Sequence, residues 1–151
     1  MTTRRRTLVR NVLLGAAGAF LLAQAVPYGH TYDNPPVVRE PAWDTPETRA
    51  LAVRACFDCH SNETRWPWYA RVAPVSWLVA RDVNEGRRKL NFSEAHLPQR
   101  KAADSAREVR RGDMPLWFYL PTHPEARLSP AEKTALADSF ARMFGEPTSG
   151  H

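Results

Sequence analysis

The chain has 151 residues, which is enough for one domain with a terminal extension. Its formal net charge is +5, but Arg4, Arg5, Arg6 and Arg10 all precede the first acidic residue, Asp33, and taking these four charges away leaves +1. The rest of the chain therefore has an ordinary mixed-charge surface, which argues against a nucleic-acid partner, and we expect none.

Residues 1–26 have the pattern of an export signal, in which basic residues precede an apolar run over residues 12–23. Residues 23–25 have the small-x-small form of a cleavage site, and cleavage would leave a soluble periplasmic protein. A helix over residues 8–26, however, would be about 28 Å long, which is nearly the hydrocarbon thickness of a membrane. We therefore expect an uncleaved signal-anchor helix that tethers the chain to the inner membrane, with the rest in the bacterial periplasm.

Residues 27–45 differ in composition, because prolines recur there beside Asp33 and Asn34. Such a segment cannot hold a helix and lacks the alternation of a strand. The pattern predicts a stiff, largely extended Pro-rich linker.

Residues 46–146 are predicted to form one helical domain, followed by a polar tail over residues 147–151. The first helix is expected to begin at Thr45-Pro46, with the threonine as N-cap, and to lead directly into Cys56. Apolar spacing predicts further helices over residues 74–90 and 98–111, the latter capped by Gly112. A capping box at residues 129–132 predicts a last helix to about Phe144, packed on the first. No convincing strand pattern appears, so the expected fold class is all-α.

Residues 54–60 contain both cysteines of the chain, followed directly by a histidine. Cys-x-x-Cys-His is the attachment signature of a c-type haem. One irregular turn at a helix end can present two thiols to the two haem vinyl groups and aim the next residue at the iron. We therefore expect one covalently attached haem c, with thioethers at Cys56 and Cys59 and with His60 as the proximal ligand.

Three other interpretations of this motif remain open but are weaker. A structural zinc site needs four protein ligands, and with no third cysteine it would have to use two further histidines. A thioredoxin-like redox pair follows a strand, whereas the residues before Cys56 have a helical pattern. A disulfide suits an exported protein, but it closes a very short loop and leaves His60 without a role.

Large aromatic residues follow the motif in a segment without a clear element. Trp66, Trp68 and Tyr69 can wall the haem pocket, or they can pack in the core near the haem without touching it. Arg65 precedes them and is expected to be a solvated charge rather than a haem contact.

Met114 is the predicted sixth ligand of the iron. A thioether is a soft ligand that suits haem iron and raises its reduction potential relative to two histidines. The residue lies in a loop bounded by Gly112 and Pro115, and the aromatic residues that follow, such as Trp117, can close the pocket.

Other assignments of this role stay open. Met114 can simply fill a gap in the core, as methionines often do. His96 and His123 are alternative ligands, because both lie in segments without a clear element. Met143 lies among core residues of the last helix and is expected to pack there.

The order of these features resembles class I c-type cytochromes. More closely, the chain resembles the single-haem "haem-binding domain" family of bacterial envelope proteins, in the stretches at residues 34–36, 56–64, 66–68, 74–77, 91–93 and 112–115. The resemblance implies that Cys56 and Cys59 carry the haem and that His60 binds the iron, and it extends less firmly to Met114. His96 stands near a position where an aromatic residue is expected, which leaves it open as a ligand.

These features together predict a monohaem c-type cytochrome that carries single electrons between envelope redox proteins. With both axial positions filled by protein there is no iron position open to a substrate, so we expect neither an enzyme nor a small-molecule substrate. Two alternatives remain: a haem-based gas or redox sensor in which Met114 is displaced, and a haem-bearing structural subunit of a membrane complex.

Overall fold

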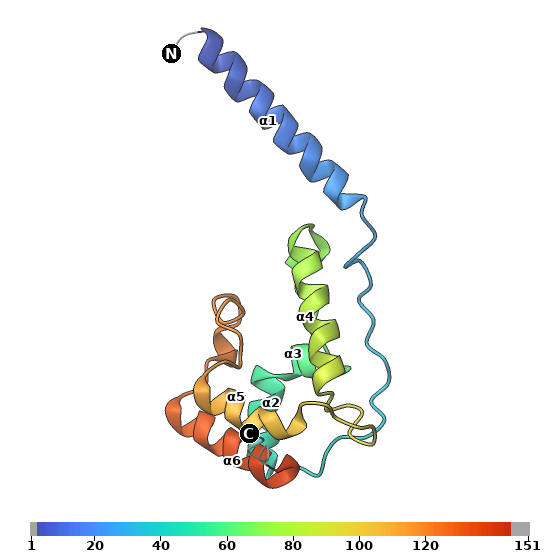
Figure 1. Cartoon of the computed structure of the whole chain (residues 1–151), viewed down its shortest axis with the longest axis vertical. Coiled ribbons are helices and arrows are strands. Elements are labelled where there is room, and N and C mark those ends of the chain that lie inside the picture. The colour runs from blue at the N-terminus through green and yellow to red at the C-terminus, as the bar shows by residue number, and fades with distance from the viewer. Residues whose placement is uncertain (1–2, 146–151) are drawn as a thin grey trace, which may run out of the picture. The chain divides into compact units, whose positions relative to one another are not determined.

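The structure is a computed structural model that describes residues 3–145, and it confirms the all-α prediction (Figure 1). The α-helices are α1 (Thr3–Gln24), α2 (Pro46–Ala55), α3 (Phe57–His60), α4 (Val75–Lys89), α5 (Ser105–Arg111) and α6 (Pro130–Phe144). The short 3-10 helices are η1 (Trp68–Arg71), η2 (Ala102–Asp104) and η3 (Pro124–Ala126). Within the described range the β-type pairing is a single isolated bridge between Arg39 and Glu94. The predicted polar tail, residues 147–151, lies outside the described residues.

The described chain divides into two compact units. The N-terminal unit contains residues 3–32 and 66–81, and the core unit contains residues 33–65 and 82–145. Helix α4 contributes residues to both units. The boundaries predicted at residues 26 and 45 stay predictions.

The first and last helices of the core unit start where local signals predict them. Thr45 caps α2, with its hydroxyl accepting a hydrogen bond from the Thr48 amide, and Pro46 occupies the first turn. Ser129 and Glu132 form the capping box of α6. The two helices pack together as expected, with Arg54 of α2 2.6 Å from Glu132 of α6.

An apolar cluster of α2, α5, α6 and the loops between them forms the core of this unit. Phe92 lies at its centre and is 1% exposed. Its ring stacks on Phe57 at 5.4 Å and on Phe140 at 5.7 Å between centroids. Phe57 lies inside the cysteine motif, so the motif is fixed to the core by one of its own side chains.

The helix predicted over residues 98–111 begins later than expected. Residues 102–104 form η2, and the α-helix starts at Ser105. The prediction is wrong at this end because the Lys101 amide donates to the carbonyl of Lys89 instead of entering a helix. The other end is correct, since Gly112 adopts a left-handed conformation with φ of 79° and caps α5.

Residues 33–45, predicted as part of a linker, belong to the core unit and are hydrogen-bonded to other segments of it. The amides of Val38 and Arg39 both donate to the Ser93 carbonyl at 3.0 Å. The Ala95 amide donates to Arg39 at 2.9 Å, and the Asn62 side chain donates to the Pro36 carbonyl. The proline pattern indicates extended backbone, but it carries no information about which groups that backbone would bind.

The N-terminal unit is built from α1, residues 25–32 and residues 66–81. Helix α1 has one stretch, from Arg4 to Gln24, that is long and apolar enough to cross a membrane, and a signal sequence has the same properties. An apolar N-terminal helix is therefore present as predicted, and both of its predicted roles, signal and anchor, are compatible with it.

Candidate functional site

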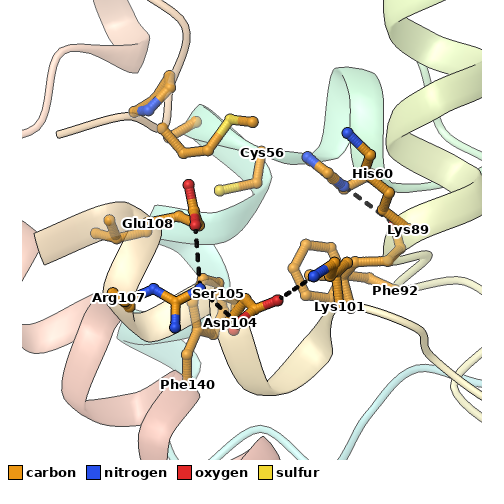
Figure 2. A pocket seen from close by; sticks show the side chains of 15 residues that line it. Cys56, His60, Lys89, Phe92, Lys101, Asp104, Ser105, Arg107, Glu108 and Phe140 are labelled. Carbon is orange, nitrogen blue, oxygen red and sulfur yellow. Dashed lines mark hydrogen bonds and ion pairs between the residues drawn. The ribbon is translucent and has the colours of Figure 1, made fainter. Parts of the chain in front are cut away.

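The core unit contains a cavity of about 220 Å³ that opens to solvent (Figure 2). Apolar side chains of Ala55, Leu90, Phe92, Val109 and Phe140 form its inner wall. Three side chains with ligand chemistry also line it, Cys56, His60 and Met114. The remaining lining residues are Lys89, Lys101, Asp104, Ser105, Arg107, Glu108 and Pro115.

The cysteine motif occupies the junction between α2 and α3. Cys56 caps the end of α2, with its amide donating to Ala52 at 2.8 Å, and it also precedes the first residue of α3. Its carbonyl then accepts from the amides of Cys59 and His60 at 3.1 and 2.9 Å. One turn thus carries both thiols and the imidazole, as the spacing predicts.

The imidazole of His60 is oriented by two backbone carbonyls of α4 and the residue after it. Its Nδ1 lies 3.1 Å from the oxygen of Gly86 and 3.0 Å from that of Leu90. Because a carbonyl oxygen can only accept, Nδ1 carries the proton and Nε2 keeps a lone pair. Burial lowers the pKa of His60, although the two carbonyls oppose this. The ring is therefore held as a neutral imidazole, the form that binds a metal ion.

Gly86 allows α4 to touch the backbone of the motif. A Cβ atom at this position would lie 2.2 Å from the carbonyl oxygen of Cys59. Any larger residue must therefore push α4 away from the motif and from His60. Sequence reasoning missed this residue, although a glycine inside an amphipathic helix is a recognisable signal.

Both cysteines are free thiols and are partly buried. Cys56 lines the cavity, whereas Cys59 lies against Gly86 of α4. Burial raises the pKa of each thiol to about 12. A reactive redox cysteine has a lowered pKa, so this environment is unlike that of a thioredoxin-type pair. Nor do residues 3–145 contain a cluster of three His, Cys, Asp or Glu side chains that could hold a metal ion by themselves, as the zinc interpretation would need.

Met114 reaches the same cavity from a separate segment. Its amide donates to the Glu108 carbonyl at 3.2 Å, next to the bond from Asp113 to the same oxygen. These bonds fix the chain directly after the cap at Gly112. The structure thus brings Met114 to the cavity shared by Cys56 and His60, and its role as a ligand stays a prediction.

The four aromatic residues predicted for the pocket are not among the described residues that line this cavity. Trp66, Trp68 and Tyr69 belong to the N-terminal unit, and the side chain of Trp68 is 77% exposed. Trp117 belongs to the core unit and is 80% exposed. Their contact with a haem stays a prediction.

The alternative histidine ligands also lie away from the described lining of the cavity. His96 is exposed to solvent. His123 stacks on the ring of Tyr119 with 3.7 Å between centroids, and its Nδ1 lies 3.1 Å from the Tyr119 carbonyl. Of the predicted sixth ligands, only Met114 is found at the described wall beside His60.

Asp58 forms a polar connection that sequence reasoning missed. Its buried carboxylate accepts hydrogen bonds from the Arg65 amide at 3.0 Å and from the Arg65 guanidinium at 3.1 and 3.2 Å. It also accepts a bond of 2.6 Å from the hydroxyl of Tyr119, whose pKa is raised by burial and by this carboxylate. Arg65, expected to be a solvated charge, is thus paired although it stays largely exposed. We call these three residues the Asp58 latch, because they join the cysteine motif to the segment after Met114.

Charged side chains surround the mouth of the cavity (Figure 2). Asp104 lies 2.9 Å from the ammonium group of Lys101 and 2.5 Å from the guanidinium of Arg107. Lys89 lines the same opening. The wall is therefore apolar inside and carries charged groups of both signs where it meets solvent, with Lys89, Lys101 and Arg107 beside Asp104 and Glu108. The three basic groups are the ones that can pair with the anionic edge of a flat apolar ligand.

This set of groups fits a haem. A neutral imidazole with a free lone pair, a thioether and a cysteine thiol line one apolar cavity, and the second thiol is in the same turn. Comparison with protein families gives a match to the model described as "Haem-binding domain" over residues 18–142, most of the chain. Searches of curated proteins and of solved structures found no match. The chain belongs to the haem-binding domain family.

Proposed function

We propose that this protein is a monohaem c-type cytochrome that carries single electrons between redox proteins of the bacterial envelope. The observation that carries the proposal is the meeting of Cys56, His60 and Met114 at one cavity from separate segments of the chain. A haem bound there supplies the one-electron chemistry of its iron.

The residues of the cavity have distinct roles in this proposal. Cys56 and Cys59 attach the group covalently, and His60 offers Nε2 to the iron. The carbonyls of Gly86 and Leu90 keep the imidazole in one orientation and make it a better donor. Met114 supplies the second axial ligand, and the apolar wall excludes water from the site.

An electron carrier explains this donor set better than an enzyme does. If His60 and Met114 both bind the iron, no coordination position is left for a substrate. We therefore propose neither a catalytic residue nor a small-molecule substrate. The partners would be other envelope redox proteins, and α1 would tether the domain to the inner membrane from the periplasmic side.

An optical spectrum of Met114→Ala, produced with a haem-attachment system, tests the ligand assignment. We expect the variant to keep its covalent haem and to lose the far-red methionine-to-ferric-iron band. Met143→Ala is the matched control, because that thioether lies in α6 beside Ser139 and is expected to leave the band unchanged. A band that survives in Met114→Ala would show that another group binds the iron.

Acidic acetone tests the covalent attachment. Pigment that stays with the denatured protein supports two thioether bonds at Cys56 and Cys59. Pigment that is extracted contradicts a c-type haem, while leaving haem binding itself intact.

A haem-based sensor is the second candidate, and the exposure around Met114 favours it. Met114 is only partly buried, and the nearby Trp117 and Phe118 are exposed. An external ligand could therefore reach this side without unfolding the core. Mixing the reduced protein with CO distinguishes the two functions, since a fast and complete spectral change favours the sensor and a slow or partial change favours the electron carrier.

A further inference from the structure

In the N-terminal unit, the end of α1 is hydrogen-bonded to a segment that follows much later in the chain. The side-chain amide of Gln24 donates to the carbonyl of Ala73 at 3.1 Å. The Ala73 amide donates back to the Gln24 side-chain oxygen at 3.0 Å. This reciprocal pair holds Ala73 beside the last residue of α1.

A second set of contacts holds the same segment against residues 28–32. The Tyr32 hydroxyl donates to the Ala70 carbonyl at 3.2 Å, and the Arg71 guanidinium lies over the Tyr32 ring, 4.7 Å from its centroid. Gly29 has φ of 78°, and a Cβ atom there would lie 2.8 Å from the Ser76 carbonyl oxygen. Residues 70–76 therefore lie in contact with residues 29–32, which follow α1.

The position of this segment relative to a bilayer follows from α1. The apolar stretch ends at Gln24, and its other end carries Arg4, Arg5, Arg6 and Arg10. If the arginines stay on the cytoplasmic side, the end at Gln24 lies at the opposite membrane–water boundary. The hydrogen bonds between Gln24 and Ala73 then place the segment at that boundary too.

The exposed side chains of this segment have the composition of a membrane interface. Trp68 is 77% exposed, Val75 is 44% exposed and Leu78 is 42% exposed. Arg71 adds a basic group in the same segment. Tryptophan is enriched at the headgroup level of membranes, where its ring is apolar and its N–H can reach water.

We propose that residues 66–78 form a membrane-docking surface whose occupant is the phospholipid bilayer that α1 crosses. Trp68, Val75 and Leu78 enter the headgroup region, and Arg71 pairs with lipid phosphates. The inference rests on the tethering part of the proposed function and gives Trp68 a role other than the haem contact predicted from sequence. It also accounts for the exposure of a large apolar side chain near the end of a membrane span.

Site-specific photo-crosslinking in the full-length haem protein tests this surface. Trp68 is replaced by benzoylphenylalanine, and the protein is reconstituted in vesicles of phosphatidylethanolamine and phosphatidylglycerol. Trp117 is the matched control, because it is similarly exposed, at 80%, but belongs to the core unit. We expect lipid adducts at position 68 in several-fold excess over position 117, when the yields are compared per covalently bound haem.

Equal lipid yields at the two positions, or adducts to protein alone at position 68, would overturn the docking surface. Intact mass measured on protein from the producing cells separates this failure from that of the proposed function. A full-length mass with covalent haem but without lipid adducts refutes only the surface. A mass that lacks residues 1–25 refutes both the tether and the docking surface. The presence or absence of the additional mass of a covalent haem in the cleaved protein still tests the proposal of a c-type cytochrome.

Discussion

The two sides of the cavity are held in place by different means. On the His60 side, the ring is bonded to two carbonyls, the His60 carbonyl accepts from the Phe92 amide at 2.8 Å, and Gly86 contacts Cys59. On the other side, Met114 is fixed by its backbone bond to α5, and the segment after it is joined to the motif by the Asp58 latch.

This difference suggests that the His60 side holds the haem in place and that the Met114 side controls exchange of the sixth ligand. The histidine side is built into packed backbone, so it can change only if α4 moves. The methionine side is held at a few points and ends in exposed aromatic side chains, so it can open locally at lower cost. We therefore expect substitutions on the His60 side to reduce the amount of haem bound per chain. Substitutions on the Met114 side should alter the exchange of the sixth ligand while the haem stays attached.

The largest effect is expected for His60→Ala. The variant loses the proposed proximal ligand and the ring N–H that lies between the oxygens of Gly86 and Leu90, although the Gly86 oxygen still accepts from the Leu90 amide. Haem bound per chain, measured from the pyridine haemochrome spectrum, should fall to a small fraction of the wild-type value. His96→Ala is the control, because His96 is exposed and outside the described wall. Equal loss in both variants would refute the assignment of His60.

A large effect is also expected for Gly86→Ala. The new methyl group overlaps the Cys59 carbonyl, and overpacking of this kind costs about 3 kcal/mol. Asn84→Ala, at an exposed position of the same helix, separates this clash from helix propensity. Urea unfolding of the haem protein measures the difference, and similar midpoints for the two variants would show that α4 does not need glycine here.

A smaller effect, confined to the methionine side, is expected for Tyr119→Phe. The variant removes the hydroxyl that donates to Asp58 and keeps the ring. The loss of about 1 kcal/mol corresponds to roughly fivefold tighter binding of imidazole in place of Met114. Spectral titration measures this, and Trp117→Phe in the same exposed loop is the control. Loss of covalent haem from Tyr119→Phe would contradict the separation of the two sides.

The smallest effect is expected at Asp44, which lies on neither side of the cavity. Hydrogen bonds from Ser139, Thr48 and Arg142 hold the pKa of its carboxyl well below the ordinary value of 3.8. A lowered pKa stabilises the folded state fully above the unfolded-state pKa, and this stabilisation is lost progressively as the pH falls from there through the folded-state pKa. Asp44→Asn should therefore cost about 1 kcal/mol at pH 7, discounted for solvent screening, and less at acid pH.

Denaturant unfolding of wild type and Asp44→Asn at pH 7 and at a series of pH values well below 4 measures this difference. A difference in unfolding free energy that is independent of pH would contradict the assigned pKa. The spectrum of the haem should be the same in both proteins, because the contacts of Asp44 are with α2 and α6.

Helix ends were predicted well where their hydrogen-bond partners are close in sequence. Thr45 caps α2 through Thr48, and Ser129 pairs with Glu132 at α6. Gly112 ends α5 for a reason intrinsic to one residue, its left-handed conformation. The start of α5 was wrong because the Lys101 amide binds a carbonyl twelve residues earlier, which no local signal could indicate.

The features of the site can also be divided into those formed by neighbouring residues and those formed by residues far apart in the sequence. The motif at residues 56–60 can be recognised from the sequence alone, because its thiols and imidazole are separated by a fixed short spacing. The orienting carbonyls, the contact at Gly86 and the latch from Asp58 to Tyr119 join groups that are far apart in the chain. Whether Trp66 and Tyr69 touch a haem stays a prediction for the same reason.

The sequence by itself thus determined the helical class and the cofactor family, and it named candidate residues for binding a haem, because these depend on residue chemistry and on neighbours within a few positions. Only the tertiary structure decided that Cys56, His60 and Met114 share a cavity and which nitrogen of His60 is free. These facts depend on which backbone carbonyls and side chains fold against the motif, and many arrangements of the same helices would satisfy the same local signals.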